Sequence, residues 1–201
     1  MSLSSIARLV AVMALAVMAT GCISHRVTFQ DAKYVTDARK NNASVLAVID
    51  PDTLAKKVTI HSFTTGIGNN WDSAPGDMLK QVVDIELPQM FSEYQFSTKD
   101  QAPSGSGPGV TLGLTVPDYK FANYHASITV NAVCKARDGH LLFEKSYTGN
   151  GPAQGGKMVF GGAFAMKSAV RQSSLAAYKQ IFADLRADMQ KALDSGTLAA
   201  R

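Results

Sequence analysis

The sequence predicts an α+β domain, in which a mainly antiparallel sheet (a hairpin plus a three-strand meander) carries two helices on one face. Three observations support this fold class. Apolar and polar residues alternate with period two through residues 110–147, and two stretches, 77–90 and 164–193, repeat with helical period. The chain has 201 residues, 46% of them hydrophobic, which suffices for one domain with a buried core.

The expected hairpin lies in the first half of the chain. Residues 45–50 (VLAVID) form a short apolar run, and residues 58–65 (VTIHSFTT) are rich in β-branched and aromatic side chains. Pro51 and Asp52 end the first run. We therefore expect two strands here.

The meander has the clearest strand pattern. Its three strands are expected at residues 110–116, 127–135 and 141–147, each with one set of side chains on a core face. The region of Pro117 and Asn123-Tyr124 joins the first two, and Asp138-Gly139 is a hairpin signal between the last two. Cys134 falls on the buried set, although a lone thiol in an oxidising compartment could also pair between chains.

Two helices follow from the spacing of apolar residues. In the first, Met78, Val82, Ile85 and Met90 share a face, Ser73 or Asp77 could cap the start, and Pro88 predicts a kink or an early end. In the second, a single face carries Val170, Tyr178, Ile181, Leu185 and Met189. Residues 98–109 and 149–162 are rich in glycine and are expected to be loops.

The first 22 residues have the pattern of an export signal. Arg8 precedes ten uninterrupted apolar residues, 9–18, a run too short to span a bilayer as a permanent helix. Small residues and Cys22 follow, and Ala19-Thr20-Gly21-Cys22 resembles the lipobox of bacterial lipoproteins, with Ala19 where leucine is commoner. This resemblance implies cleavage before Cys22 and acylation of that cysteine by fatty acids such as palmitate.

Residue 23 is Ile rather than Asp, which by resemblance to lipoprotein sorting favours the periplasmic face of the outer membrane. The expected organisation is a signal peptide over 1–21 and a lipid-anchored polar tether over 22–43. A single domain over 44–196 and a tail over 197–201 follow.

The sequence offers little catalytic chemistry. The four histidines (His25, His61, His125 and His140) lack the spacing of a zinc site, and no nucleophile elbow occurs. Residues 151–157 match the start of a phosphate-binding loop, but Met158 stands where Ser or Thr is required.

Asp84 and Glu86 are two residues apart on a helix and point to different sides. We expect a non-enzymatic protein with no metal, no cofactor and no nucleic-acid partner, since 20 basic and 16 acidic residues are scattered.

Two features could instead contact a partner. Trp71 stands in a polar, glycine-rich stretch, where it is either a binding aromatic or a residue folded onto the core edge. Residues 157–167 (KMVFGGAFAMK) are almost entirely apolar, and they form either a buried connector or an exposed flap that docks on a protein or a membrane. The candidate contact residues of this segment are Met158, Val159, Phe160, Phe164 and Met166.

The order of elements also resembles a known group. The phrases LPQMFSEYQFS, VTLGLTVPDY and ASITVNAVCKARDGHLLFEKSY before a long final helix look like the YajG-type lipoproteins and, more loosely, the LptE-like and transport-auxiliary lipoproteins. The resemblance covers roughly residues 75–193 and carries no catalytic residues. It implies an envelope interaction or assembly module that contacts another envelope protein. The alternative is a transport-auxiliary lipoprotein that binds a lipid or small apolar ligand in a cavity of several hundred Å³.

Overall fold

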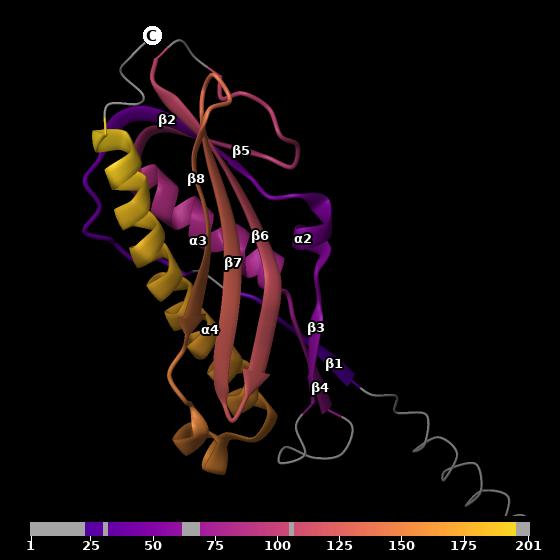
Figure 1. The fold of residues 1–201 in the computed structure, drawn as a ribbon. Coiled ribbons are helices and arrows are strands. Elements are labelled where there is room, and N and C mark those ends of the chain that lie inside the picture. Colours follow the sequence, from indigo (N-terminus) through magenta and orange to yellow (C-terminus); the bar gives the residue numbers. More distant parts are fainter. Residues whose placement is uncertain (1–22, 30–31, 62–68, 105–106, 196–201) are drawn as a thin grey trace, which may run out of the picture.

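The computed structural model describes residues 23–29, 32–61, 69–104 and 107–195, and it has the expected α+β architecture (Figure 1). A five-stranded sheet has the strand order β5-β2-β6-β7-β8, and a second sheet has the order β1-β4-β3. The strands of the larger sheet are β2 (Asn41–Val48), β5 (Phe91–Ser97), β6 (Gly109–Ala122), β7 (His125–Ala136) and β8 (Leu141–Asn150).

The meander is confirmed, and it is longer than expected. β6, β7 and β8 pair antiparallel, and the even-numbered residues of β7 from Ala126 to Ala136 are buried while the odd-numbered ones are partly exposed. The turn between β6 and β7 holds Asn123 and Tyr124 at φ of 49° and 60°, as a two-residue hairpin turn requires. Gly139 takes φ of 88° in the turn between β7 and β8.

Pro117 does not end its strand. The register between β6 and β7 shifts between Thr115 and Asp118, so that the proline lies at a bulge, where a strand tolerates a residue without an N–H. β6 therefore continues to the turn at Asn123.

The expected hairpin of residues 45–50 and 58–65 is wrong. β2 lies inside the larger sheet and pairs in parallel with β5 on one side and β6 on the other. After β2, the short helix α2 (Pro51–Ala55) leads to β3 (Val58–His61), which belongs to the second sheet. Asp50 caps α2 by accepting a hydrogen bond from the Thr53 N–H, so the Pro51-Asp52 pair starts a helix rather than a hairpin turn.

The stretch expected to be a free tether takes part in the fold. β1 (Ile23–Val27) pairs in parallel with β4 (Asn69–Ser73), which pairs antiparallel with β3. Val27 is fully buried and Phe29 is 5% exposed, with its ring 6.0 Å from that of Tyr178 in an edge-on arrangement. Residues 23–29 therefore belong to the domain, because β1 pairs with β4 and the Val27 and Phe29 side chains lie in the core.

Two helices cover one face of the larger sheet, as expected (Figure 1). α3 (Pro75–Met90) begins with a proline in its first turn and no side-chain cap, so neither Ser73 nor Asp77 caps it. It continues through Pro88 and ends at Met90, where β5 follows directly. Met78, Val82 and Met90 are buried as the helical spacing predicts.

The C-terminal helix is longer than expected. α4 (Gly155–Asp194) has 40 residues and begins within the stretch expected to be a glycine-rich loop. Its five predicted core residues are all buried. It passes close to the end of β8, since a Cβ atom at Gly151, the residue after β8, would lie 1.9 Å from the Ser173 carbonyl oxygen. Among the described residues, no helix combines the length and apolar character needed to cross a membrane.

Candidate functional site

An extended segment of residues 32–40, here called the strap, contacts the end of α3 and the middle of α4. On the α3 side, Gln89 accepts a hydrogen bond from the Thr36 N–H at 2.9 Å and donates one to the Tyr34 carbonyl at 3.3 Å. On the α4 side, the Lys179 ammonium lies 4.0 Å from the centre of the Tyr34 ring. The strap therefore holds contacts with both helices.

A buried charge lies beneath the strap. The Glu86 side chain on α3 is 1% exposed, and its carboxylate accepts a hydrogen bond from the Arg186 guanidinium of α4, which is 24% exposed. Burial, and then the nearby Glu86 carboxylate, raise the pKa of the Tyr34 phenol far above its usual range. Tyr34 therefore remains neutral beside this ion pair.

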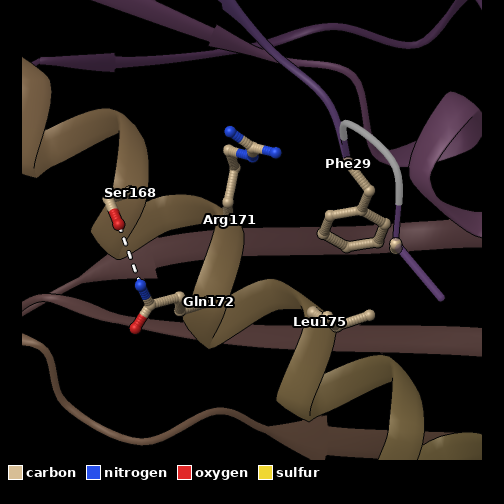
Figure 2. Close-up of a pocket in the computed structure, with 6 residues that line it drawn as sticks. Phe29, Ser168, Arg171, Gln172 and Leu175 are labelled. Atoms are coloured by element: carbon tan, nitrogen blue, oxygen red, sulfur yellow. Dashed lines mark hydrogen bonds between the residues drawn. The ribbon is translucent and has the colours of Figure 1, made fainter. Parts of the chain in front are cut away.

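An open groove lies where the chain from β1 passes α4. It has a volume of about 280 Å³ and is drawn in Figure 2. Phe29 faces α4 across the groove, and Gln172 donates a hydrogen bond to Ser168 at 2.9 Å along the helix. The groove is lined by Phe29, Ala32, Ser168, Arg171, Gln172 and Leu175.

A second groove lies further along α4, on the other side of Tyr34. It has a volume of about 290 Å³ and is lined by both charged and apolar side chains. Arg39 and Arg186 contribute its positive charge, and Asp37 its negative charge. The two grooves are open depressions of mixed polarity, and neither is the enclosed apolar cavity expected of a lipid carrier.

Trp71 and Met166 are core residues. Trp71 is fully buried in β4, with its ring 6.2 Å from that of His25, and Met166 is 3% exposed. The expectation that they contact a partner is wrong for these two, because they have almost no surface to offer. The polar neighbours of Trp71 lie in a strand whose alternation turns the indole inward.

The other four candidate contact residues, Met158, Val159, Phe160 and Phe164, fall in the first turns of α4. Their side chains lie outside the part of the structure that is described. The segment 157–167 is helical rather than a loop or flap.

The described residues bring no metal-binding group together. Among them, no three His, Cys, Asp or Glu side chains gather closely enough to hold an ion. His61 and His140 are exposed at separate places, and the His61 Nδ1 atom lies 2.8 Å from the Asn70 side-chain oxygen. Cys134 is a free, buried thiol, and burial raises its pKa to about 12, so it is a poor nucleophile.

Sequence reasoning missed the groups beneath the strap. Asp84 and Glu86 do point to different sides of α3: Asp84 pairs with Lys80 at 2.6 Å, and Glu86 faces α4. The signal that could have found the ion pair is the position of Glu86 between Val82, Val83 and Leu87 on the apolar face, where an unpaired carboxylate would be costly.

No protein-family model matches the sequence, and no curated protein matches it. Several solved structures resemble the fold, including the three that follow. Protein XCC0632 from Xanthomonas campestris, assigned to family model DUF330, has 11% identity and a TM-score of 0.48, and covers 84% of this chain and 98% of its own. An uncharacterized protein has 17% identity and a TM-score of 0.45, covering 83% and 99%. The hypothetical protein CT253 from Chlamydia trachomatis has 6% identity and a TM-score of 0.41, covering 75% and 99%.

Proposed function

We propose that this chain is a lipoprotein anchored to the periplasmic face of the bacterial outer membrane, where it acts as a non-enzymatic interaction or assembly module of the cell envelope. The observation that carries the proposal is the N-terminal pattern: Arg8, a ten-residue apolar run, and Ala19-Thr20-Gly21-Cys22. An acylated cysteine provides stable anchoring when two or three chains enter the bilayer, since each buried CH₂ contributes about 0.8 kcal/mol.

The interior of the domain supports a role by contact rather than by carrying a ligand. The largest fully buried side chains include Trp71, Tyr178, Phe91 and Phe182, which fill the space between the sheets and helices. YajG-type lipoproteins, which the sequence resembles, suggest another envelope protein as the partner.

The anchor is tested by replacing the modified residue. Cys22→Ser is expected to leave the N-terminal peptide without acyl chains and to remove the protein from the outer-membrane fraction. The measurements are the mass of that peptide and membrane fractionation. Cys134→Ala is the matched control, because Cys134 is buried and far along the chain, and it should leave both readouts unchanged. Retention of the Cys22→Ser protein in the outer membrane would refute the anchor.

The partner is tested by crosslinking in cells with photoreactive probes at Phe160 and Phe164. A discrete protein adduct supports the interaction module, and its mass identifies the partner. Adducts with lipids only would place this segment at the bilayer, and they, like the absence of any adduct, would remove the support for a protein partner at this segment.

For the second candidate function, a transport-auxiliary lipoprotein that binds a lipid or small apolar ligand, the open groove beside Phe29 and Leu175 would be the binding site. Its volume of about 280 Å³ is close to the smallest ligand pockets. A fluorescent lysophospholipid is the probe, and Leu175→Trp should block its binding by filling the groove. Equal binding by the variant and the parent protein would count against this site.

A further inference from the structure

The described fold begins one residue after the proposed site of acylation. Ile23 is the first residue of β1 and pairs with Asn69, and the pairing continues to Val27 and Ser73. Consecutive Cα atoms are about 3.8 Å apart across a trans peptide bond. If Cys22 is acylated, as proposed above, no spacer separates the acyl chains from the start of β1. The anchor then restricts which part of the domain can face the bilayer.

Three parts of the chain lie at the same end of the molecule. In Figure 1, the lower end holds the start of β1, the turn between β6 and β7, and the first turns of α4, while the end of α4 lies at the opposite end. The Tyr124 carbonyl in that turn accepts a hydrogen bond from the Gln154 N–H at 2.9 Å, directly before α4. We call this end, comprising Ile23, Asn123-Tyr124 and residues 155–167, the anchor end.

The charges of α4 divide along its length. Its first 25 residues, 155–179, carry Lys157, Lys167, Arg171 and Lys179 and no acidic residue, whereas its acidic residues are Asp184, Asp188 and Asp194. The sequence around the β6–β7 turn is also free of acids from Tyr119 to Arg137. Lysine and arginine near a bilayer attract anionic lipid headgroups. The half of α4 that begins at the anchor end therefore has the sign that suits a phospholipid surface.

The composition of the first turns of α4 completes the pattern. Between Lys157 and Lys167 stand only apolar residues and glycine (MVFGGAFAM), and this segment is helical. Helices that bind at the interface between headgroups and acyl chains carry Lys or Arg together with large apolar side chains such as Phe. Apart from the buried Met166, this helix end has the composition of such an interfacial segment.

We infer that the anchor end rests on the bilayer, and that the first turns of α4 contact anionic phospholipid headgroups beside the acylated Cys22. This orientation depends on the proposed lipid anchor. It directs the turn between β7 and β8, and the end of α4, away from the membrane. β7 has 12 residues, so its two ends are separated by roughly 40 Å at about 3.3 Å per residue.

Depth-dependent quenching tests this orientation on the full-length acylated protein in vesicles. A fluorophore is attached to Ala153→Cys, an exposed position directly before α4, or to His140→Cys, an exposed position in the opposite turn. Cys134 is buried and stays unlabelled. With a spin-labelled phospholipid in the vesicles, we expect strong quenching at position 153 and little at position 140.

The outcomes separate the orientation from the anchor. If the protein carries acyl chains and enters vesicles but the probe at position 140 is quenched as strongly as that at 153, the orientation is refuted and the anchor stands. If neither probe is quenched, the orientation is also refuted and the anchor stands, since the domain would then lie away from the bilayer. If the N-terminal peptide carries no acyl chain, the proposed function itself fails.

A pair of charge variants tests the contact with headgroups. Vesicles are made of phosphatidylcholine alone or with added phosphatidylglycerol, and quenching at position 153 is compared. We expect phosphatidylglycerol to increase the quenching, and Lys167→Ser to weaken the association of the anchor end about fivefold. Lys191→Ser, at the other end of α4, is the matched control and should behave like the parent protein. An equal effect of the two substitutions would overturn the headgroup contact.

Discussion

The guanidinium of Arg186 on α4 pairs with the carboxylate of Glu86 on α3, and the Glu86 side chain is only 1% exposed. The two residues are 100 positions apart in the sequence. A buried carboxylate is tolerated only when its charge is compensated, so this pair fixes how the two helices meet beneath the strap.

Removing one partner of the pair should therefore cost more than removing both. We expect Arg186→Ala to lower the free energy of unfolding by about 3 kcal/mol, because it leaves the Glu86 carboxylate buried and unpaired. The double variant Glu86→Gln/Arg186→Met should recover most of this loss. Chemical denaturation of the three proteins measures the effect, and a double variant less stable than Arg186→Ala would contradict it.

The residues after β1 are expected to stabilise the domain. Phe29 is 5% exposed and packs edge-on against Tyr178, so Phe29→Ala should lower the free energy of unfolding by about 3 kcal/mol. Val35 is 91% exposed on the strap, and Val35→Ala is the control, with an expected change below about 0.5 kcal/mol. Thermal or urea unfolding compares the two. Equal, small effects would show that residues 23–29 are a tether after all.

The close approach of α4 to the residue that follows β8 depends on a glycine. In Gly151→Ala, the new Cβ would meet the Ser173 carbonyl at 1.9 Å, so helix or strand must shift, at a cost of about 1–3 kcal/mol. A Cβ at Gly156 meets nothing within 4 Å, and Gly156→Ala in the first turn of α4 should be neutral or slightly stabilising. Melting temperatures distinguish the two variants. If Gly151→Ala leaves the melting temperature unchanged, α4 does not approach residue 151 as closely as described.

Acid should weaken the attachment of α4 to β8. Asp188 accepts hydrogen bonds from Lys145 and from the Tyr147 hydroxyl, both at 2.7 Å, and these lower the pKa of its carboxyl. The Asp188 carboxyl therefore takes up a proton at a higher pH in the unfolded chain than in the folded protein. The stability that the carboxylate contributes is present above about pH 4 and is lost as the pH falls further.

In Asp188→Asn, the free energy of unfolding should consequently fall by about 1 kcal/mol less between neutral and acid pH than in the parent protein. This value is discounted for the partial exposure of the site. Asp184→Asn, which removes the same charge from an exposed position on the same helix, is the control. The free energy of unfolding is measured from neutral pH to pH 3. If the free energy of unfolding falls with pH in the same way in both variants, the role given to Asp188 is excluded.

The parts of the fold that the sequence predicts well are those with local patterns. The meander follows from alternation and from turns that need positive φ, at Asn123, Tyr124 and Gly139. The core face of α4 follows from helical spacing. β5 was not predicted, because Phe91 follows Met90 of α3 without a loop residue between helix and strand.

Long-range pairing explains the other failures. β2 pairs in parallel with β5 and β6, and no local signal distinguishes a central parallel strand from one arm of a hairpin. β4 has the sequence NNWDS, whose polar residues suggest a loop, and it becomes a strand by pairing with β1 and β3. The burial of Trp71 depends on that pairing and was missed with it. Of the residues beneath the strap, none was predicted as a site.

The strap also sets an order of folding. A chain is made from its N-terminus, yet the strap contacts Lys179, and Asn41 donates a hydrogen bond to Gln190, close to the end of the last helix. These contacts cannot form until nearly the whole chain is available, whereas the β6–β7–β8 meander needs only its own neighbours in sequence. The first residues of the domain to be made are thus among the last to reach their final positions. Loss of the last turns of α4 would remove the Gln190 contact and so loosen the chain where the strap meets β2.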